Sequence, residues 1–265
     1  MSVTPNFFRA ISLMAFAILP SIAMAQASDS VRLISAPPGK DGGNIGLALI
    51  VGKQYQGSDE RRTMVVPNLE YQWANGWFAG VRNGVGYNFS SDPSLQYGAR
   101  VMVDFGRKED RSIALKGMGD IETKAKLGAF LNYSLSPEFM FTSAIGIGGN
   151  GSGSALDLGF SYSTKLSEQM RLSAGAGVKW GNAEYMQTNF GVNSTQALRS
   201  GYRQYSPGAG VSDAHLQLAL SYKVAPQTTV IAAVSSSMLS NEAKSSPIVR
   251  DANSVTGLLG VAYAF

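Results

Sequence analysis

One short stretch places a hydroxyl, a carboxyl and an imidazole within four residues: Ser212, Asp213 and His215. These are the residue types of a hydrolase in which a histidine, held by an acid, activates a serine. No surrounding motif supports such a site, so we interpret His215 as an inward-facing side chain near the end of a strand. The chain is therefore not expected to be an enzyme. Loss of phospholipid or lipid A hydrolysis on His215→Ala would overturn this interpretation.

Composition excludes several other chemistries. The 265 residues contain no cysteine and one histidine, which rules out disulfides, thiolate metal sites and multi-histidine metal sites. The net charge of +4 comes without a basic run, so no nucleic-acid partner is expected. We predict no cofactor, no metal and no catalytic residue.

The elements that would position these side chains are strands, because apolar residues recur at every second position. The closing stretch Ser254–Phe265 is the clearest example, with an apolar face that ends in Val261, Tyr263 and Phe265. An aromatic final residue with a second aromatic two positions earlier resembles the last strand of bacterial outer-membrane barrels. We therefore interpret Val261, Tyr263 and Phe265 as a lipid-facing signal for the barrel-assembly machinery.

The same alternation recurs in eleven segments along the chain. Their apolar faces often end in Tyr, Trp or Phe, and their opposite faces are mostly Gly, Ala and Ser, which suits a wall between lipid and a crowded lumen. We predict an all-β fold: a single antiparallel transmembrane β-barrel over residues 44–265. The expected strands are Asn44–Gly52, Val65–Trp73, Trp77–Tyr87, Tyr97–Gly106, Lys124–Tyr133, Phe139–Gly148, Leu156–Ser163, Met170–Trp180, His215–Lys223, Val230–Val234 and Ser254–Phe265.

The first residues are expected to direct export. A short region with Arg9 precedes the apolar stretch Ala10–Ile18 and the small-residue site Ala23-Met24-Ala25, which together indicate a signal peptide over residues 1–25, cleaved after Ala25. Residues 26–43 are expected to be a loosely ordered entry segment. An exported barrel is expected in the outer membrane of a Gram-negative cell envelope.

The connections divide into short turns and long segments. Arg107–Glu122, Gly181–Ser212 and Leu239–Asn253 are long, and bacterial barrels carry long loops outside and short turns at the periplasm. Both termini should then be periplasmic, which requires an even number of strands. We predict 12 strands, with 10 as the alternative. The preferred candidate for the missing strand is Tyr185–Val192, and the others are Val31–Ala36 and Ser112–Lys116. Loop placement conflicts with this preference, because it requires the missing strand to precede Arg107 and so favours Val31–Ala36.

Charged residues on the small-residue faces are expected to line the lumen. Basic residues outnumber acidic ones, which indicates either an anion-favouring lumen or charge pairs that fill the interior. The candidate lumen residues are Glu70, Arg82, Arg100, Asp104, Lys124, Lys126, Asp157, Lys165, Arg171, Lys179, His215 and Lys223.

One loop has the composition of an interaction surface. The stretch from Ser200 to Gly210 carries Tyr202, Arg203 and Tyr205, and these residue types are favoured at interface hot spots. Its glycines, Gly201, Gly208 and Gly210, suit an irregular loop. It is equally well interpreted as a plug folded into the lumen.

Several short motifs follow one another along residues 44–265. They include Tyr55, Gly57, Ser58, Pro67, Gly191, Gln196, Ser246 and Pro247, together with Gly260–Phe265. In this order and spacing they resemble the MipA/OmpV family of outer-membrane proteins. The segment Arg107–Glu122 has few residues that match.

The resemblance implies a scaffold role. The family's namesake is described as linking a lytic transglycosylase to a bifunctional penicillin-binding protein during peptidoglycan enlargement, which implies a protein partner at the periplasmic side. Other members resemble general outer-membrane proteins, so a porin-like pathway for small solutes is the alternative. A lipid-modifying enzyme barrel is the remote one.

Overall fold

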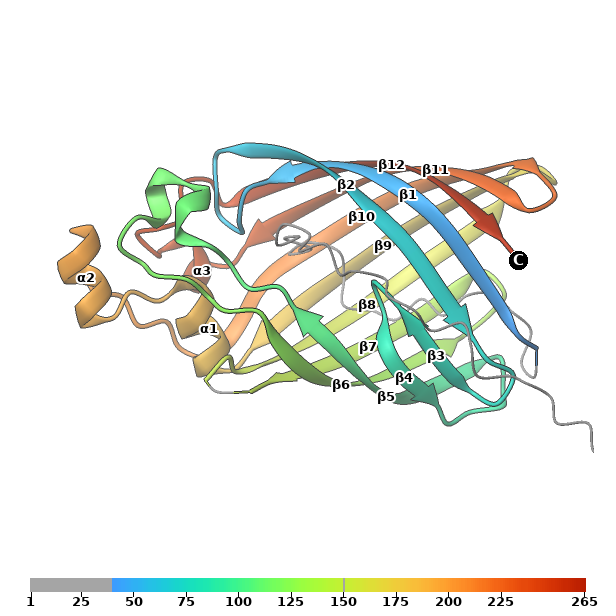
Figure 1. The fold of residues 1–265 in the computed structure, drawn as a ribbon, viewed down its shortest axis with the longest axis horizontal. Helices are drawn as coiled ribbons and strands as arrows, with labels where there is room; N and C mark the ends of the chain where they lie inside the picture. Colours follow the sequence, from blue (N-terminus) through green and yellow to red (C-terminus); the bar gives the residue numbers. More distant parts are fainter. Residues whose placement is uncertain (1–39, 150) are drawn as a thin grey trace, which may run out of the picture.

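The computed structural model describes residues 40–149 and 151–265, which form a closed barrel of 12 antiparallel strands (Figure 1). Each strand pairs with its neighbours in sequence, and β1 closes the ring against β12. The predicted 12-stranded barrel is thereby confirmed. The predicted signal peptide, its cleavage at Ala25 and all but the last residues of the entry segment lie outside the described residues.

Most strands are long enough to cross a bilayer when tilted. Their bounds are β1 Gly42–Lys53, β2 Arg61–Gln72, β3 Trp77–Gly80, β4 Gly84–Asn88, β5 Leu95–Asp104, β6 Lys124–Ser134, β7 Phe139–Gly148, β8 Ser154–Lys165, β9 Met170–Gly181, β10 Gly210–Ala225, β11 Thr228–Leu239 and β12 Asn253–Ala264. The helices are short: η1 Glu109–Arg111, η2 Ile113–Leu115, α1 Ala183–Phe190, α2 Ser194–Ser200 and α3 Asn241–Lys244. Within the described chain, no helix has both the length and the apolar character needed to span a membrane.

The outer face of the barrel is apolar, as lipid contact requires. Leu47 and Val261 pair across β1 and β12 with their side chains 55% and 46% exposed on this face. Aromatic side chains form a belt near one end, where the Trp77 and Tyr87 rings lie 5.4 Å apart and the Phe139 and Tyr162 rings 4.8 Å apart. These rings sit where the strands meet short turns, which is the position of an interfacial girdle.

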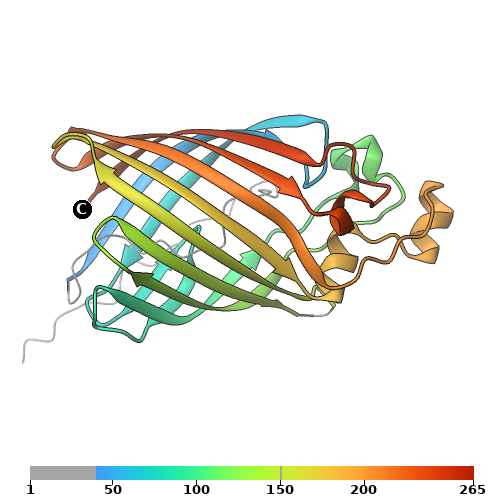
Figure 2. The same cartoon turned by 180° about the vertical axis from the view of Figure 1, so that it is seen from behind.

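The two ends of the barrel differ. One, here called the turn end, holds the start of β1, the end of β12 and the short turns, including Leu135–Glu138 and Leu166–Gln169. The other, here called the loop end, holds the helices and long connections (Figures 1 and 2). The predicted division into short turns and long loops is therefore correct.

The twelfth strand is not where any of the three candidates placed it. The predicted strand Trp77–Tyr87 is a hairpin of two short strands, β3 and β4, with a turn at residues 81–83. Tyr185–Val192 instead contains most of helix α1, Ser112–Lys116 forms η2, and Val31–Ala36 lies outside the described residues. The expectation that the missing strand precedes Arg107 was correct, because the extra strand lies in this hairpin.

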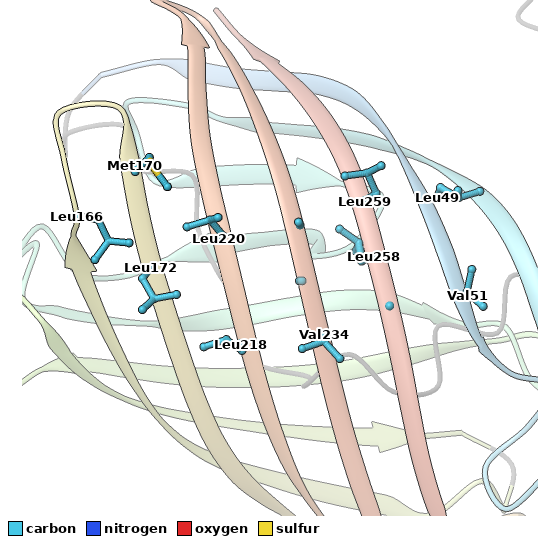
Figure 3. A pocket seen from close by; sticks show the side chains of 13 residues that line it. Leu49, Val51, Leu166, Met170, Leu172, Leu218, Leu220, Val234, Leu258 and Leu259 are labelled. Carbon is cyan, nitrogen blue, oxygen red and sulfur yellow. The ribbon is translucent and has the colours of Figure 1, made fainter.

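A shallow apolar hollow of about 720 Å³ crosses the outer face over β9–β12 and β1 (Figure 3). Ala232 has a small side chain and Gly257 has none, which leaves a depression between larger neighbours such as Leu218, Leu220 and Leu259. All its lining residues are apolar, so the hollow belongs to the lipid-facing surface.

Candidate functional site

The long connections pack together at the loop end into one structure, here called the loop cap: residues 54–60, 105–123, 182–209 and 240–252. Two buried apolar clusters hold it together. The first joins Tyr55, Ala114, Leu115, Met118, Val192 and Ile248, and the second joins Met186, Phe190, Leu239 and Ala243. Because residues from all four connections contribute, the cap is a folded unit and not a set of independent loops.

Tyr55 is one of the six buried residues of the first cluster. Its side chain is buried, and its hydroxyl donates to the Ile248 carbonyl at 2.7 Å. The guanidinium of Arg107 lies 5.8 Å from the centre of the ring. Burial raises the pKa of the Tyr55 hydroxyl to about 12, although Arg107 and Arg250 act in the opposite direction.

The turn after Tyr55 fixes two connections to each other. Gly57 has a φ of 99°, a conformation that favours glycine, and its carbonyl accepts from Arg250 N at 2.7 Å and Asp251 N at 3.1 Å. Ser58 is fully buried, and its Oγ accepts from Glu60 N at 3.0 Å. At the edge of the cap, Lys53 Nζ pairs with Asp251 at 2.6 Å and holds the pKa of that carboxyl below its usual range.

Helix α2 docks on the connection between β5 and β6. Asn193 and Gln196 form a capping box at its start, and Gln196 Nε2 also donates to the Met118 carbonyl at 2.8 Å. The helix ends at Gly201, whose φ is 77°. The segment that matched the family least therefore packs against one of the matching positions.

The predicted interaction or plug loop lies in the cap. Its two tyrosines and Arg203 contact other connections: Tyr202 Oη donates to the Ala114 carbonyl at 3.1 Å, Tyr205 Oη to Glu242 O at 2.6 Å, and Arg203 Nη2 to Ser245 O at 2.8 Å. Ser200 Oγ donates back to Gln196 O at 2.6 Å, and Gly208 and Gly210 have open space beside them. These side chains thus join parts of the cap.

The remaining family positions also lie in or near the cap. Ser246 Oγ donates to the Phe190 carbonyl at 2.5 Å, linking α3 to the end of α1, and half-buried Pro247 follows it. Gly191 ends α1, and a Cβ there would collide with Gln187. The exceptions are Pro67, which lies within β2 of the wall, and Gly260–Phe265, which lie at the end of β12.

Ser212, Asp213 and His215 do come together, but not as a hydrolase triad. Ser212 Oγ donates to Asp213 Oδ2 at 2.8 Å and not to the imidazole. The two imidazole nitrogens face carboxylates, with Nδ1 3.5 Å from Asp213 and Nε2 4.0 Å from Asp157. Gln56 Nε2 donates to Asp213 at 3.0 Å, so this group connects the cap to the barrel wall.

The register determines which candidate lumen residues line the inner wall. Glu70, Arg100 and Asp157 are buried there, and Lys124, Lys126, Lys179 and His215 are partly buried. Two of these side chains lie flat against glycines of the neighbouring strand: Lys126 against Gly146, and His215 against Gly177. A Cβ at either glycine would collide with the side chain that lies over it.

The five other candidate lumen residues are more exposed than a position inside the lumen would make them. Lys165, Arg171 and Lys223 are exposed at the turn end, and Asp104 is exposed at the loop end of β5. Arg82 was assigned to a strand and lies in the turn of the β3–β4 hairpin, so that expectation was wrong.

Taken together, the apolar outer face, the aromatic belt and the folded cap define a membrane-spanning β-barrel that carries a folded unit of its own loops at one end. The chain belongs to the MltA-interacting protein MipA family, whose model matches residues 45–265. It is 26% identical over 208 residues to the MltA-interacting proteins of Escherichia coli and Shigella flexneri, covering 76% of this chain and 81% of each relative.

Solved structures with a similar outline include a porin and a transporter. The KdgM porin has a TM-score of 0.47 at 10% identity and covers 84% of this chain and 99% of its own. The Pseudomonas putida toluene transporter TodX has a TM-score of 0.42 at 11% identity and covers 92% of this chain and 97% of its own.

Proposed function

We propose that this protein is a non-enzymatic adaptor of the outer membrane that binds a lytic transglycosylase, and through it a penicillin-binding protein. The observation that carries the proposal is the family match over residues 45–265, with relatives named for their interaction with MltA. As an outer-membrane barrel it would be exported and assembled by the barrel-assembly machinery. Its final residues support this, because Val261, Tyr263 and Phe265 face outward on the closing strand.

The turn end is the side on which such a partner would dock. Short turns and chain termini face the periplasm in bacterial barrels, and peptidoglycan lies there. Two neighbouring turns have the same rigid design: Ser136 Oγ accepts from Glu138 N and Phe139 N, and Ser167 Oγ accepts from Gln169 N and Met170 N. Each turn presents an exposed carboxylate, Glu138 or Glu168.

Affinity capture from crosslinked envelopes tests the proposal. We expect the tagged protein to retain a lytic transglycosylase, and the double variant Glu138→Lys with Glu168→Lys to retain about tenfold less, since reversing rim charges typically weakens encounter. The matched control is Glu242→Lys, an exposed carboxylate of the loop cap. Equal capture by all three proteins, or no capture by the unaltered one, would contradict the assignment.

A second function is favoured by the inner wall. Arg100, Lys124 and Lys126 lie on adjacent strands β5 and β6 and face inward. Arg100 and Lys126 lie along glycines of the wall, so a basic surface lines this side of the interior. We infer that, if the cap opens, the barrel conducts small anions in preference to cations.

A further inference from the structure

The hydrogen-bonded wall of the barrel is interrupted beside the β3–β4 hairpin. The two hairpin strands have 4 and 5 residues, whereas the flanking β2 and β5 have 12 and 10 (Figure 1). β2 pairs with β3 only over Glu70–Gln72, and β5 pairs with β4 only over Gly98–Val101. Beyond these pairs, no described strand completes the wall between β2 and β5, and we call this interruption the β2–β5 gap.

The strand pattern shows which backbone groups face the gap. In an antiparallel ladder, residues two apart direct their N–H and C=O to the same side. The Leu69 carbonyl accepts from Val81 N at 2.9 Å, so Thr63, Val65 and Pro67 direct their backbone groups to this side too. On the opposite edge, the Tyr97 carbonyl accepts from Phe89 N at 2.8 Å, so Val103 faces the gap.

The margins of the gap are fixed and not frayed. The buried carboxylate of Glu70 accepts from Arg82 N at 2.9 Å and from Asn83 Nδ2 at 3.0 Å. These bonds hold the turn between β3 and β4 beside Glu70 of β2. Gly84 then turns the chain with a φ of 74°.

Pro67 argues against a strand of another protein as the occupant. Its missing N–H belongs on the gap side of β2, and proline on an exposed edge opposes strand addition. Backbone groups that face lipid without partners are costly, and irregular backbone at membrane depth is tolerated where it is buried in protein or lines a water-filled path. No described strand covers the gap, which is the arrangement that a water-filled opening requires.

We propose that the β2–β5 gap is a lateral portal between the lumen and the membrane for small uncharged amphipathic molecules. The rim offers apolar side chains, with Val65 62% and Val103 56% exposed, next to backbone donors and acceptors. A molecule with an apolar body and a hydroxyl-bearing group can contact the apolar side chains and also hydrogen-bond to the backbone groups. The portal does not depend on the adaptor role, since it lies in the barrel wall and not at the turns.

Cysteine accessibility tests whether water reaches the gap, and the natural absence of cysteine makes single replacements specific. Val65 on β2 and Leu49 on β1 lie directly opposite each other, on the same outer face, so Leu49→Cys is the control for Val65→Cys. A charged methanethiosulfonate should label Val65→Cys about tenfold faster in proteoliposomes. Thr63→Cys against its register partner Val51→Cys provides a second pair if the first fails to fold. Equal, slow labelling within a folded pair overturns the proposal.

Solute flux tests passage. Proteoliposomes should take up phenyl glucoside faster than glucose, and Val103→Trp at the rim should reduce phenyl glucoside uptake at least about fivefold. Leu127→Trp, which replaces an exposed residue on the fully paired outer wall, should leave uptake unchanged. Uptake that is the same in Val103→Trp as in the unaltered protein overturns the portal. Neither measurement involves a transglycosylase, so failure here is distinguishable from failure of the adaptor proposal.

Discussion

Tyr55 and Ile248 are 193 positions apart in the chain, yet the hydroxyl of one donates to the carbonyl of the other at 2.7 Å within a buried cluster. The bond joins the first and last connections of the loop cap. Most family-motif positions lie around it, which assigns those motifs to the folding of the loop cap. If the partner docks at the turn end, the motifs and the docking surface are separated by the length of the barrel.

Replacing Tyr55 with Phe should loosen the cap while leaving the barrel intact. The change leaves a buried carbonyl without its donor, which costs about 1–2 kcal/mol. We expect roughly five- to thirtyfold faster tryptic cleavage at Arg199 and Arg203, since cleavage follows the open population. Tyr205→Phe is the control, because its hydroxyl bond to Glu242 lies at an exposed site. Equal cleavage rates for Tyr55→Phe and the unaltered protein would show that this bond does not hold the cap.

Cap stability should fall in alkaline solution through the same residue. The Tyr55 pKa is about 12 in the folded protein and about 10 in an unfolded chain. The unfolded form therefore loses its proton first, and stability is intact below about pH 10 and declines toward pH 12. The cap's thermal midpoint should drop more from pH 9 to pH 11 in the unaltered protein than in Tyr55→Phe. Parallel drops would mean that other groups dominate the response.

The short hairpin should be sensitive to its turn glycine. Gly84 has a positive φ, and a Cβ there would collide with the Val101 carbonyl, so Gly84→Ala should cost about 1–3 kcal/mol. Urea unfolding in vesicles, followed by the combined fluorescence of Trp73, Trp77 and Trp180, measures the loss. Gly257→Ala serves as the control, since nothing lies within 4 Å of a Cβ at that position. An equal effect of the two substitutions would refute the strain argument.

This hairpin also shows where sequence reasoning failed in the wall. Alternation predicted the other strands because their outer and inner faces differ so clearly in side-chain size. Val81 and Val85 keep the same phase through the turn, so residues 77–87 looked continuous. The signal was nevertheless present, because Asn83-Gly84 is the same hairpin dipeptide as Asn75-Gly76.

The cap was less predictable, because its contacts join distant segments. Residues 185–192 alternate well enough to resemble a strand, but buried Met186 and Phe190 are four apart, which is the helical spacing. The Asn193–Gln196 capping box was a readable helix start. No local pattern could reveal that Tyr55 meets Ile248, or that Gln56 reaches Asp213, since those contacts depend on the closed barrel.

Electrophysiology would test the anion pathway inferred from the inner wall. In planar bilayers under a KCl gradient, Tyr55→Phe should open more often than the unaltered protein, with a reversal potential that shows preference for chloride. Lys126→Glu places a carboxylate on the inner face of β6 and should lower that preference severalfold. Lys116→Glu changes the same charge at an exposed site of the cap and should leave it unchanged. An absence of single-channel steps in both the unaltered protein and Tyr55→Phe would rule out conduction through this barrel.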